Sequence, residues 1–291
     1  MPQPWLILAI LCIAVVIVVI DNTFVNVALP ILSARVHASD AGLQWIVDSY
    51  PLPFVGVLLA GDELSDRWGR RRVMQYALLG FALCSDMAAE NHSLAPLLVA
   101  RALMGASAAF IFPATLSLIT NNFDDLAQRA LAFGVWGATA CVATAIGPIA
   151  GGYLIDHFWF ESVFVVNVPV ACVTNALAAY AVPESRSPVH RRVDLGGLLL
   201  RSVSISALVL AIIEGPSWHW RSTGVLGLIV VAVLTFICFA NFELDRRDPM
   251  LDVCLFRRGS FSAALAAIAT SFLGLFGFVF LVTQYFPLVL G

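Results

Sequence analysis

The chain has 291 residues, of which 60% are hydrophobic and only 12% are charged, and its formal net charge is −3. A soluble domain carries roughly 25% charged residues, so this composition excludes a water-soluble globular fold, and the slightly acidic balance excludes a basic nucleic-acid binder. What remains is a protein that crosses a membrane many times, because each crossing needs about 20 mostly apolar residues.

Nine apolar stretches bounded by polar clusters predict nine membrane-spanning helices. Only helices and closed barrels satisfy backbone polar groups in lipid, and these apolar runs lack the alternation of barrel strands. We therefore expect an all-α polytopic fold. In chain order, the predicted spans cover residues 5–32, 43–65, 73–90, 94–119, 128–153, 162–182, 194–214, 222–242 and 259–290.

Two polar residues, Asp21 and Asn26, interrupt the first predicted span. An ionised carboxylate is costly to bury in lipid, so Asp21 is suited to take up and release a proton during transport, or to hold a cation. A helix–helix hydrogen bond is the alternative interpretation, since polar side chains in membranes make such bonds too.

A short loop rich in arginine follows the second predicted span. Glycine there permits a tight turn, the aspartate can pair with the arginines, and the arginines attract anionic lipid headgroups. An ordinary positively charged cytoplasmic loop is the alternative interpretation. In order, the loop contains Asp66, Arg67, Gly69, Arg70, Arg71 and Arg72.

The fourth predicted span contains a full charge, Arg101. A charge inside a span costs at least about 2.5–3.5 kcal/mol, so Arg101 either finds a partner, lines a wet cavity, or extends its head towards the interface. The first two possibilities are functional and the third is structural.

The fifth predicted span contains a cluster of glycine and proline. Gly147 and Gly151 have the spacing that lets helix backbones approach closely, Pro148 removes one helix hydrogen bond, and Gly152 follows. A kinked, closely packed helix is a suitable surface for one part of a transporter to rock on another. Phe133 and Trp136 in the same span are interpreted as packing residues, and an aromatic platform for the substrate is the alternative.

The arginines also predict the topology. All 16 basic residues are arginines, and twelve of them follow even-numbered predicted spans. Positive residues concentrate in cytoplasmic loops, so we expect a cytoplasmic N-terminus.

The motifs of soluble enzymes are missing from the sequence. The six cysteines and five histidines lack metal-ligand spacing, and the sequence contains no P-loop, dinucleotide fingerprint or nucleophile elbow. We therefore expect no enzyme activity, cofactor or metal, and transport energy would come from an ion gradient.

Taken in order, these motifs resemble the major facilitator superfamily, and more narrowly its fourteen-span drug:proton antiporters of the EmrB/QacA type. Three positions depart from the family pattern, namely Asp62 and Ala143 where glycine is usual and Met104 where glutamine is usual. The matching segments are Ile20–Pro30, Gln44–Tyr50, Leu64–Arg71, Arg101–Ala109, Gly147–Gly152, Phe164–Pro169, Pro183–Arg186, Asp194–Gly197 and Pro249–Asp252.

The resemblance implies a domain organisation. Residues 1–183 would form the N-terminal six-helix bundle, residues 184–258 a two-helix linker, and residues 259–291 the first helix of a second bundle. The family uses fourteen spans and nine are predicted here, so the sequence is expected to be truncated after the ninth span.

The resemblance also implies a function, which is proton-coupled efflux of hydrophobic or cationic small molecules across the bacterial cytoplasmic membrane. Asp21, Asn26 and Arg101 would serve proton coupling or substrate binding. The Asp66–Arg71 loop would gate the cytoplasmic side, and Gly147–Gly152 would form the rocking seam. The alternative is a product that does not transport by itself, acting as a membrane binding or regulatory subunit or as one half of a transporter with a complementing partner.

Overall fold

The computed structural model describes residues 3–36, 38–91, 93–186, 195–244, 259–271 and 273–274. Every regular element in these ranges is an α-helix, which confirms the predicted all-α class. The chain divides into two compact units, Met1–Phe239 and Ala240–Gly291, which we describe separately.

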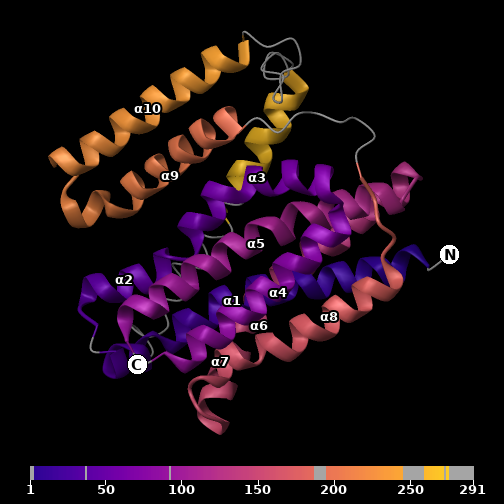
Figure 1. Ribbon diagram of the computed structural model, residues 1–291, viewed down its shortest axis with the longest axis horizontal. Coiled ribbons are helices and arrows are strands. Elements are labelled where there is room, and N and C mark those ends of the chain that lie inside the picture. The colour runs from indigo at the N-terminus through magenta and orange to yellow at the C-terminus, as the bar shows by residue number, and fades with distance from the viewer. Residues whose placement is uncertain are drawn as a thin grey trace. The chain divides into compact units, whose positions relative to one another are not determined.

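Within the described residues, the ten helices labelled α1 to α10 follow one another along the chain (Figure 1). In the second unit, an apolar helix covers Gly259–Ser271. The ten are α1 (Pro4–Val36), α2 (Asp40–Asp48), α3 (Pro51–Trp68), α4 (Arg70–Glu90), α5 (Leu94–Asn122), α6 (Leu126–His157), α7 (Ser162–Val165), α8 (Asn167–Ala181), α9 (Leu195–Trp218) and α10 (Thr223–Leu244).

Two of the predicted spans are broken in the structure. The second span forms α2 and α3, because Pro51 begins a new helix and has no N–H to donate to the carbonyl of Val47, four residues earlier. The sixth span forms α7 and α8, where Pro169 in the first turn of α8 has no N–H to donate back to Val165.

Within the described residues, six helical segments are long and apolar enough to cross a membrane. The helices at 43–65 and 73–90 do not meet that standard. The first region is divided into α2 and α3 and carries Asp48, Asp62 and Glu63, and the second carries Asp86 and Glu90. Beyond Gly274, the predicted ninth span lies outside the described residues. The six are Pro4–Leu32, Leu94–Asn122, Leu126–His157, Ser162–Ala181, Gly196–Trp218 and Thr223–Phe242.

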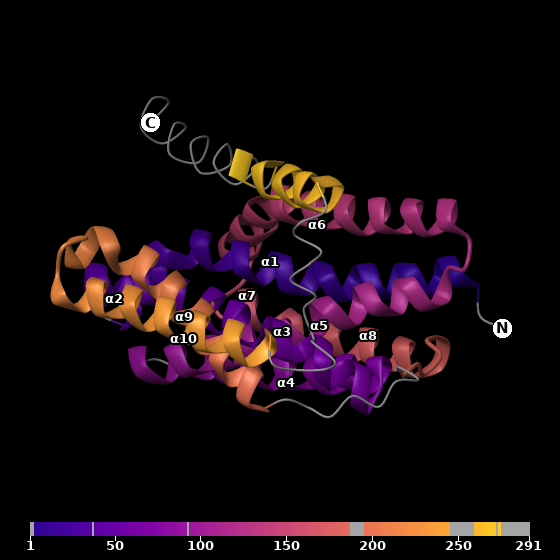
Figure 2. The same ribbon diagram turned by 90° about the horizontal axis from the view of Figure 1, so that it is seen from above.

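Helix α1 is central to the first unit. It packs on α5, α6 and α8, and Figure 2 shows it between α5 and α6. Helix α4 packs on α5 and α8, and α3 packs on α5 and α9. Small residues let these helices approach closely in the absence of a hydrophobic driving force between them. Fully buried alanines include Ala14, Ala28, Ala100, Ala108 and Ala114.

The unit boundary falls between Phe239 and Ala240, whereas the division expected from the resemblance falls at 183 and 258. Helices α1 to α8 lie within residues 1–183, the region expected to be the N-terminal bundle, and α9 packs against α3 within the same unit. Two parts of the predicted linker, residues 187–194 and 245–258, lie outside the described residues.

Candidate functional site

A buried ion pair joins α1 to α5. The Nη1 atom of Arg101 donates to Oδ2 of Asp21 at 2.7 Å, and both side chains are 0% exposed. Removing two charges from water costs several kcal/mol each, so such a pair persists only with good geometry and further hydrogen bonds. The structure thus brings together two of the three residues predicted for proton coupling.

The second oxygen of Asp21 is held by α8. The side-chain amide of Asn167 donates to Oδ1 of Asp21 at 2.7 Å, and the same nitrogen lies 3.0 Å from Oγ of Ser85. Ser85, on α4, donates in turn to the carbonyl of Phe164 at 2.8 Å. Side chains from four helices therefore form one buried polar network, which we call the Asp21 cluster.

Arg101 has two further neighbours. Its guanidinium carbon lies 4.6 Å from the centre of the Tyr50 ring, a cation–π geometry, and its Nε donates to the carbonyl of Ile46 at 3.5 Å. Among the described residues, the buried Nη2 atom has no hydrogen-bond partner. The guanidinium of Arg101 is therefore paired with Asp21 through Nη1, while its Nη2 atom stays available for another hydrogen bond.

Gly105, one turn beyond Arg101, makes this arrangement possible. A Cβ atom at that position would overlap the carbonyl of Tyr50. The absence of a side chain therefore lets the start of α3 approach α5 closely enough to place the Tyr50 ring on Arg101. The Tyr50 hydroxyl donates to the carbonyl of Val18 at 3.3 Å, which ties the same residue to α1.

Asn26 lies apart from the Asp21 cluster. Its side chain is exposed and donates to the carbonyl of Asn22, one turn earlier in α1. The prediction that Asn26 acts together with Asp21 rests on their place in one predicted span. Ser85 and Asn167 belong to the cluster but have no role predicted from the sequence. The feature that could have indicated them is a polar residue within an apolar stretch.

The arginine-rich loop is tied to two neighbouring segments. Nη2 and Nε of Arg70 donate to one oxygen of Asp66 at 2.6 and 2.9 Å, and Nη1 of Arg70 reaches the carbonyl of Ser117 on α5 at 3.4 Å. The backbone N–H of Arg71 donates to Glu184 at 3.2 Å, and its Nη1 donates to the carbonyl of Val182 at 3.0 Å. The loop is thereby fixed both to α5 and to the chain that follows α8.

Gly69 is required at the junction of α3 and α4. Its φ of 107° lies in a region that only glycine adopts readily, and an added Cβ would lie 2.6 Å from a carboxylate oxygen of Glu184. Glu184 also lies 3.6 Å from Nε of Arg72. This acid organises the loop, and its only sequence signal was its place in the Pro183–Arg186 match.

Two glycines of α6 face α1. Gly147 and Gly151 are buried, and a Cβ atom on them would overlap Oγ1 of Thr23 and lie 3.0 Å from the ring of Phe24, respectively. Gly152 has open space beside it and Pro148 is exposed. In the first unit, the close-packed seam thus runs between two helices of the same bundle.

Three aromatic rings on three helices make a further group. Phe112 on α5 contacts Phe54 on α3 and Trp136 on α6 edge to face, with ring centres 5.7 and 5.2 Å apart. All three side chains are only half-buried, and Trp136 donates to Thr115 at 3.2 Å. The group offers both flat apolar surface and ring faces suited to a cation.

The sequence model of the Major Facilitator Superfamily matches residues 11–291. The chain is 36% identical to "Multidrug efflux pump LfrA" of Mycolicibacterium smegmatis over 99% of this chain and 57% of that protein. It is 35% identical to "Multidrug resistance protein Stp" of Mycobacterium tuberculosis (94% and 51%) and 34% identical to "Puromycin resistance protein pur8" of Streptomyces alboniger (98% and 56%). The chain spans about half the length of these relatives.

A solved structure supports the fold alone. The "POT family transporter PepTSo" superposes with a TM-score of 0.61 at 15% sequence identity, over 84% of this chain and 54% of that one.

Proposed function

Because this chain belongs to the Major Facilitator Superfamily, we propose that it acts in proton-coupled efflux of hydrophobic or cationic small molecules. The names of the relatives LfrA, Stp and pur8 support a small-molecule substrate class. The observation that carries the proposal is the Asp21 cluster, a fully buried carboxylate paired with Arg101 and Asn167.

The proposed coupling follows from the energetics of a buried pair. Breaking such a pair by neutralising one partner costs about 3–5 kcal/mol, since the other charge stays buried and unpaired. A proton on Asp21 would therefore be accompanied by movement of Arg101 towards another partner. Since Asp21 and Arg101 lie on different helices, a change of protonation would favour a different helix arrangement.

The remaining residues receive roles in the same scheme. The half-buried rings of Phe54, Phe112 and Trp136 would contact the substrate, because flat aromatic surface accepts apolar and cationic molecules without a fixed hydrogen-bond pattern. The bonds of Arg70 to Asp66 and to α5, and of Arg71 to Glu184, would hold the cytoplasmic end in one conformation.

Alternating access requires a second bundle for the first to move against. The chain covers 54% of the PepTSo chain and 51–57% of the three relatives above. We propose that residues 1–291 work together with a second bundle. By themselves, these residues would bind substrate without transporting it.

A chimera tests the coupling role. This chain would replace the matching part of LfrA, and ethidium efflux would be followed in energised everted vesicles. We expect efflux that a protonophore abolishes and that Asp21→Asn abolishes. The matched control is Asp156→Asn, at an exposed position near the end of α6, which should retain efflux. Efflux that survives Asp21→Asn would refute the role of Asp21.

A further inference from the structure

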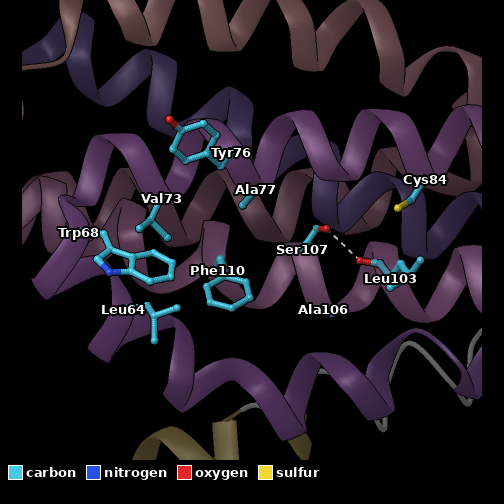
Figure 3. Close-up of a pocket in the computed structure, with 10 residues that line it drawn as sticks. All are labelled: Leu64, Trp68, Val73, Tyr76, Ala77, Cys84, Leu103, Ala106, Ser107 and Phe110. Atoms are coloured by element: carbon cyan, nitrogen blue, oxygen red, sulfur yellow. Dashed lines mark hydrogen bonds between the residues drawn. The ribbon is translucent and has the colours of Figure 1, made fainter. Parts of the chain in front are cut away.

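A groove on the face formed by α3, α4 and α5 is unrelated to the Asp21 cluster. It has a volume of about 330 Å³, and Figure 3 shows apolar side chains of the three helices around it. The hydroxyl of Ser107, a polar group in its wall, is already bonded to the carbonyl of Leu103 at 2.9 Å. The groove is therefore suited to hydrocarbon and offers little to a polar ligand.

The length of the groove matches one leaflet of a bilayer. On α4 its lining runs from Val73 to Cys84. The eleven steps from Val73 to Cys84, at the rise of an α-helix, cover about 16 Å. The hydrocarbon core is about 30 Å thick, so one leaflet is about 15 Å deep.

A strongly basic hollow adjoins one end of the groove. It has a volume of about 290 Å³, shares Trp68, Val73 and Tyr76 with the groove, and adds three arginines, Arg67, Arg72 and Arg186. In the described part of the chain, Arg72 has an acid partner in Glu184 at 3.6 Å, whereas Arg67 and Arg186 make no ion pair. The hollow therefore has a surplus of positive charge.

We propose that the groove and the hollow together bind one anionic glycerophospholipid of the bilayer. Its phosphate lies among Arg67, Arg72 and Arg186, because guanidinium groups recognise phosphate oxygens with paired, charge-assisted hydrogen bonds. One acyl chain follows α4 and α5 along the apolar groove.

The two aromatic residues between the groove and the hollow support a lipid in particular. Trp68 is 57% exposed and Tyr76 is 72% exposed. Exposed tryptophan and tyrosine gather at the level of lipid headgroups, which is the depth at which phosphate and acyl chain meet. A free anion would use the arginines and leave the groove empty.

Native mass spectrometry of the purified chain in detergent tests the proposal. Phosphatidylglycerol and phosphatidylcholine with identical acyl chains are offered in equal amounts. A single interfacial arginine contributes about 1 kcal/mol to binding of an anionic lipid, so we expect phosphatidylglycerol to be retained at least about fivefold more than phosphatidylcholine. Equal retention of the two lipids would overturn the proposal.

Variants locate the headgroup. Arg67→Gln combined with Arg186→Gln should remove the preference for phosphatidylglycerol, and each single variant should reduce it if the double variant does not purify. Arg221→Gln is the control, since it removes one exposed arginine that lies outside the hollow. The arginine site is ruled out if the double variant keeps the preference for phosphatidylglycerol. It is also ruled out if Arg221→Gln lowers that preference by the same amount.

Two further arms separate the lipid from a free anion. Ala106→Phe places a ring in the groove and should lower the retained phosphatidylglycerol, while Ala145→Phe at an exposed position of α6 should not. Inorganic phosphate at the same concentration should displace little lipid. Full displacement by phosphate, or no effect of Ala106→Phe, would identify a small-anion site and refute the lipid site.

Discussion

Asp21 and Arg101 lie eighty residues apart in the chain and 2.7 Å apart in the bundle, with no solvent on either side chain. At the residue scale, this pair sets a stringent chemical requirement on the molecule. A charge left alone there would be both unsolvated and unpaired, so the two residues are energetically a unit.

The first prediction concerns this unit. Arg101→Met should destabilise the chain by about 3–5 kcal/mol because it leaves Asp21 unpaired. Combining it with Asp21→Asn should recover much of that loss, since no buried charge then remains. The apparent melting temperature, followed by size-exclusion chromatography after heating, measures both effects.

Measuring efflux in the same variants distinguishes an effect on stability from an effect on proton coupling. The double variant Asp21→Asn/Arg101→Met should remain inactive in the chimera even where its melting temperature recovers. A double variant that is less stable than either single variant would contradict the pairing. Recovery of proton-driven efflux would contradict the coupling role.

The second prediction concerns Gly69. Gly69→Ala should destabilise the chain by about 1–2 kcal/mol, because alanine is disfavoured at positive φ, and its Cβ would also meet Glu184. Gly152→Ala is the matched control, as it adds the same methyl group beside open space within a helix. The change in melting temperature should differ between the two variants, either in sign or clearly in size. Equal changes would argue against the Glu184 contact.

Single residues also mark the limit of sequence reasoning here. Asp21 and Arg101 stand out because a charge in an apolar stretch is conspicuous. Asn167, Ser85 and Glu184 do not, since an amide, a hydroxyl and a loop acid are unremarkable until packing shows what they bond. Their roles in the site depend on neighbours that are 79 to 146 residues distant.

At the scale of elements, the seam between α1 and α6 depends on Gly147 and Gly151. The third prediction is that Gly147→Leu destabilises the chain by about 1–3 kcal/mol, because the added side chain must displace Thr23 of α1. Gly137→Leu, on the same helix beside open space, should be tolerated. Melting temperatures distinguish the two, and equal tolerance would mean that α1 and α6 are loosely packed.

Helix positions were predictable to within a few residues, and helix breaks were less so. The second predicted span reads as one apolar stretch, yet it forms α2 and α3 because Pro51 disrupts the backbone hydrogen bonds locally. A hydropathy average over about 20 residues does not detect such a break, because the break depends on the backbone geometry of a single proline.

At the scale of the whole molecule, the fourth prediction concerns the need for a second bundle. Proteoliposomes containing only residues 1–291 should bind ethidium, seen as a change in its fluorescence, and should show no proton-driven uptake. The chimera with the remainder of LfrA should show both. Uptake by residues 1–291 alone would refute the requirement for a second bundle.

The sequence by itself determined that this protein is helical, lies in a membrane and belongs to the Major Facilitator Superfamily. The reason is that lipid leaves backbone groups no partner outside their own helix, so apolar length alone specifies a span. Only the tertiary structure decided that Asp21 meets Arg101 and Asn167 while Asn26 does not, and that Arg67 and Arg186 share a hollow with Trp68. Those contacts depend on how helices rotate and approach one another, which small residues such as Gly105 permit and no local pattern specifies.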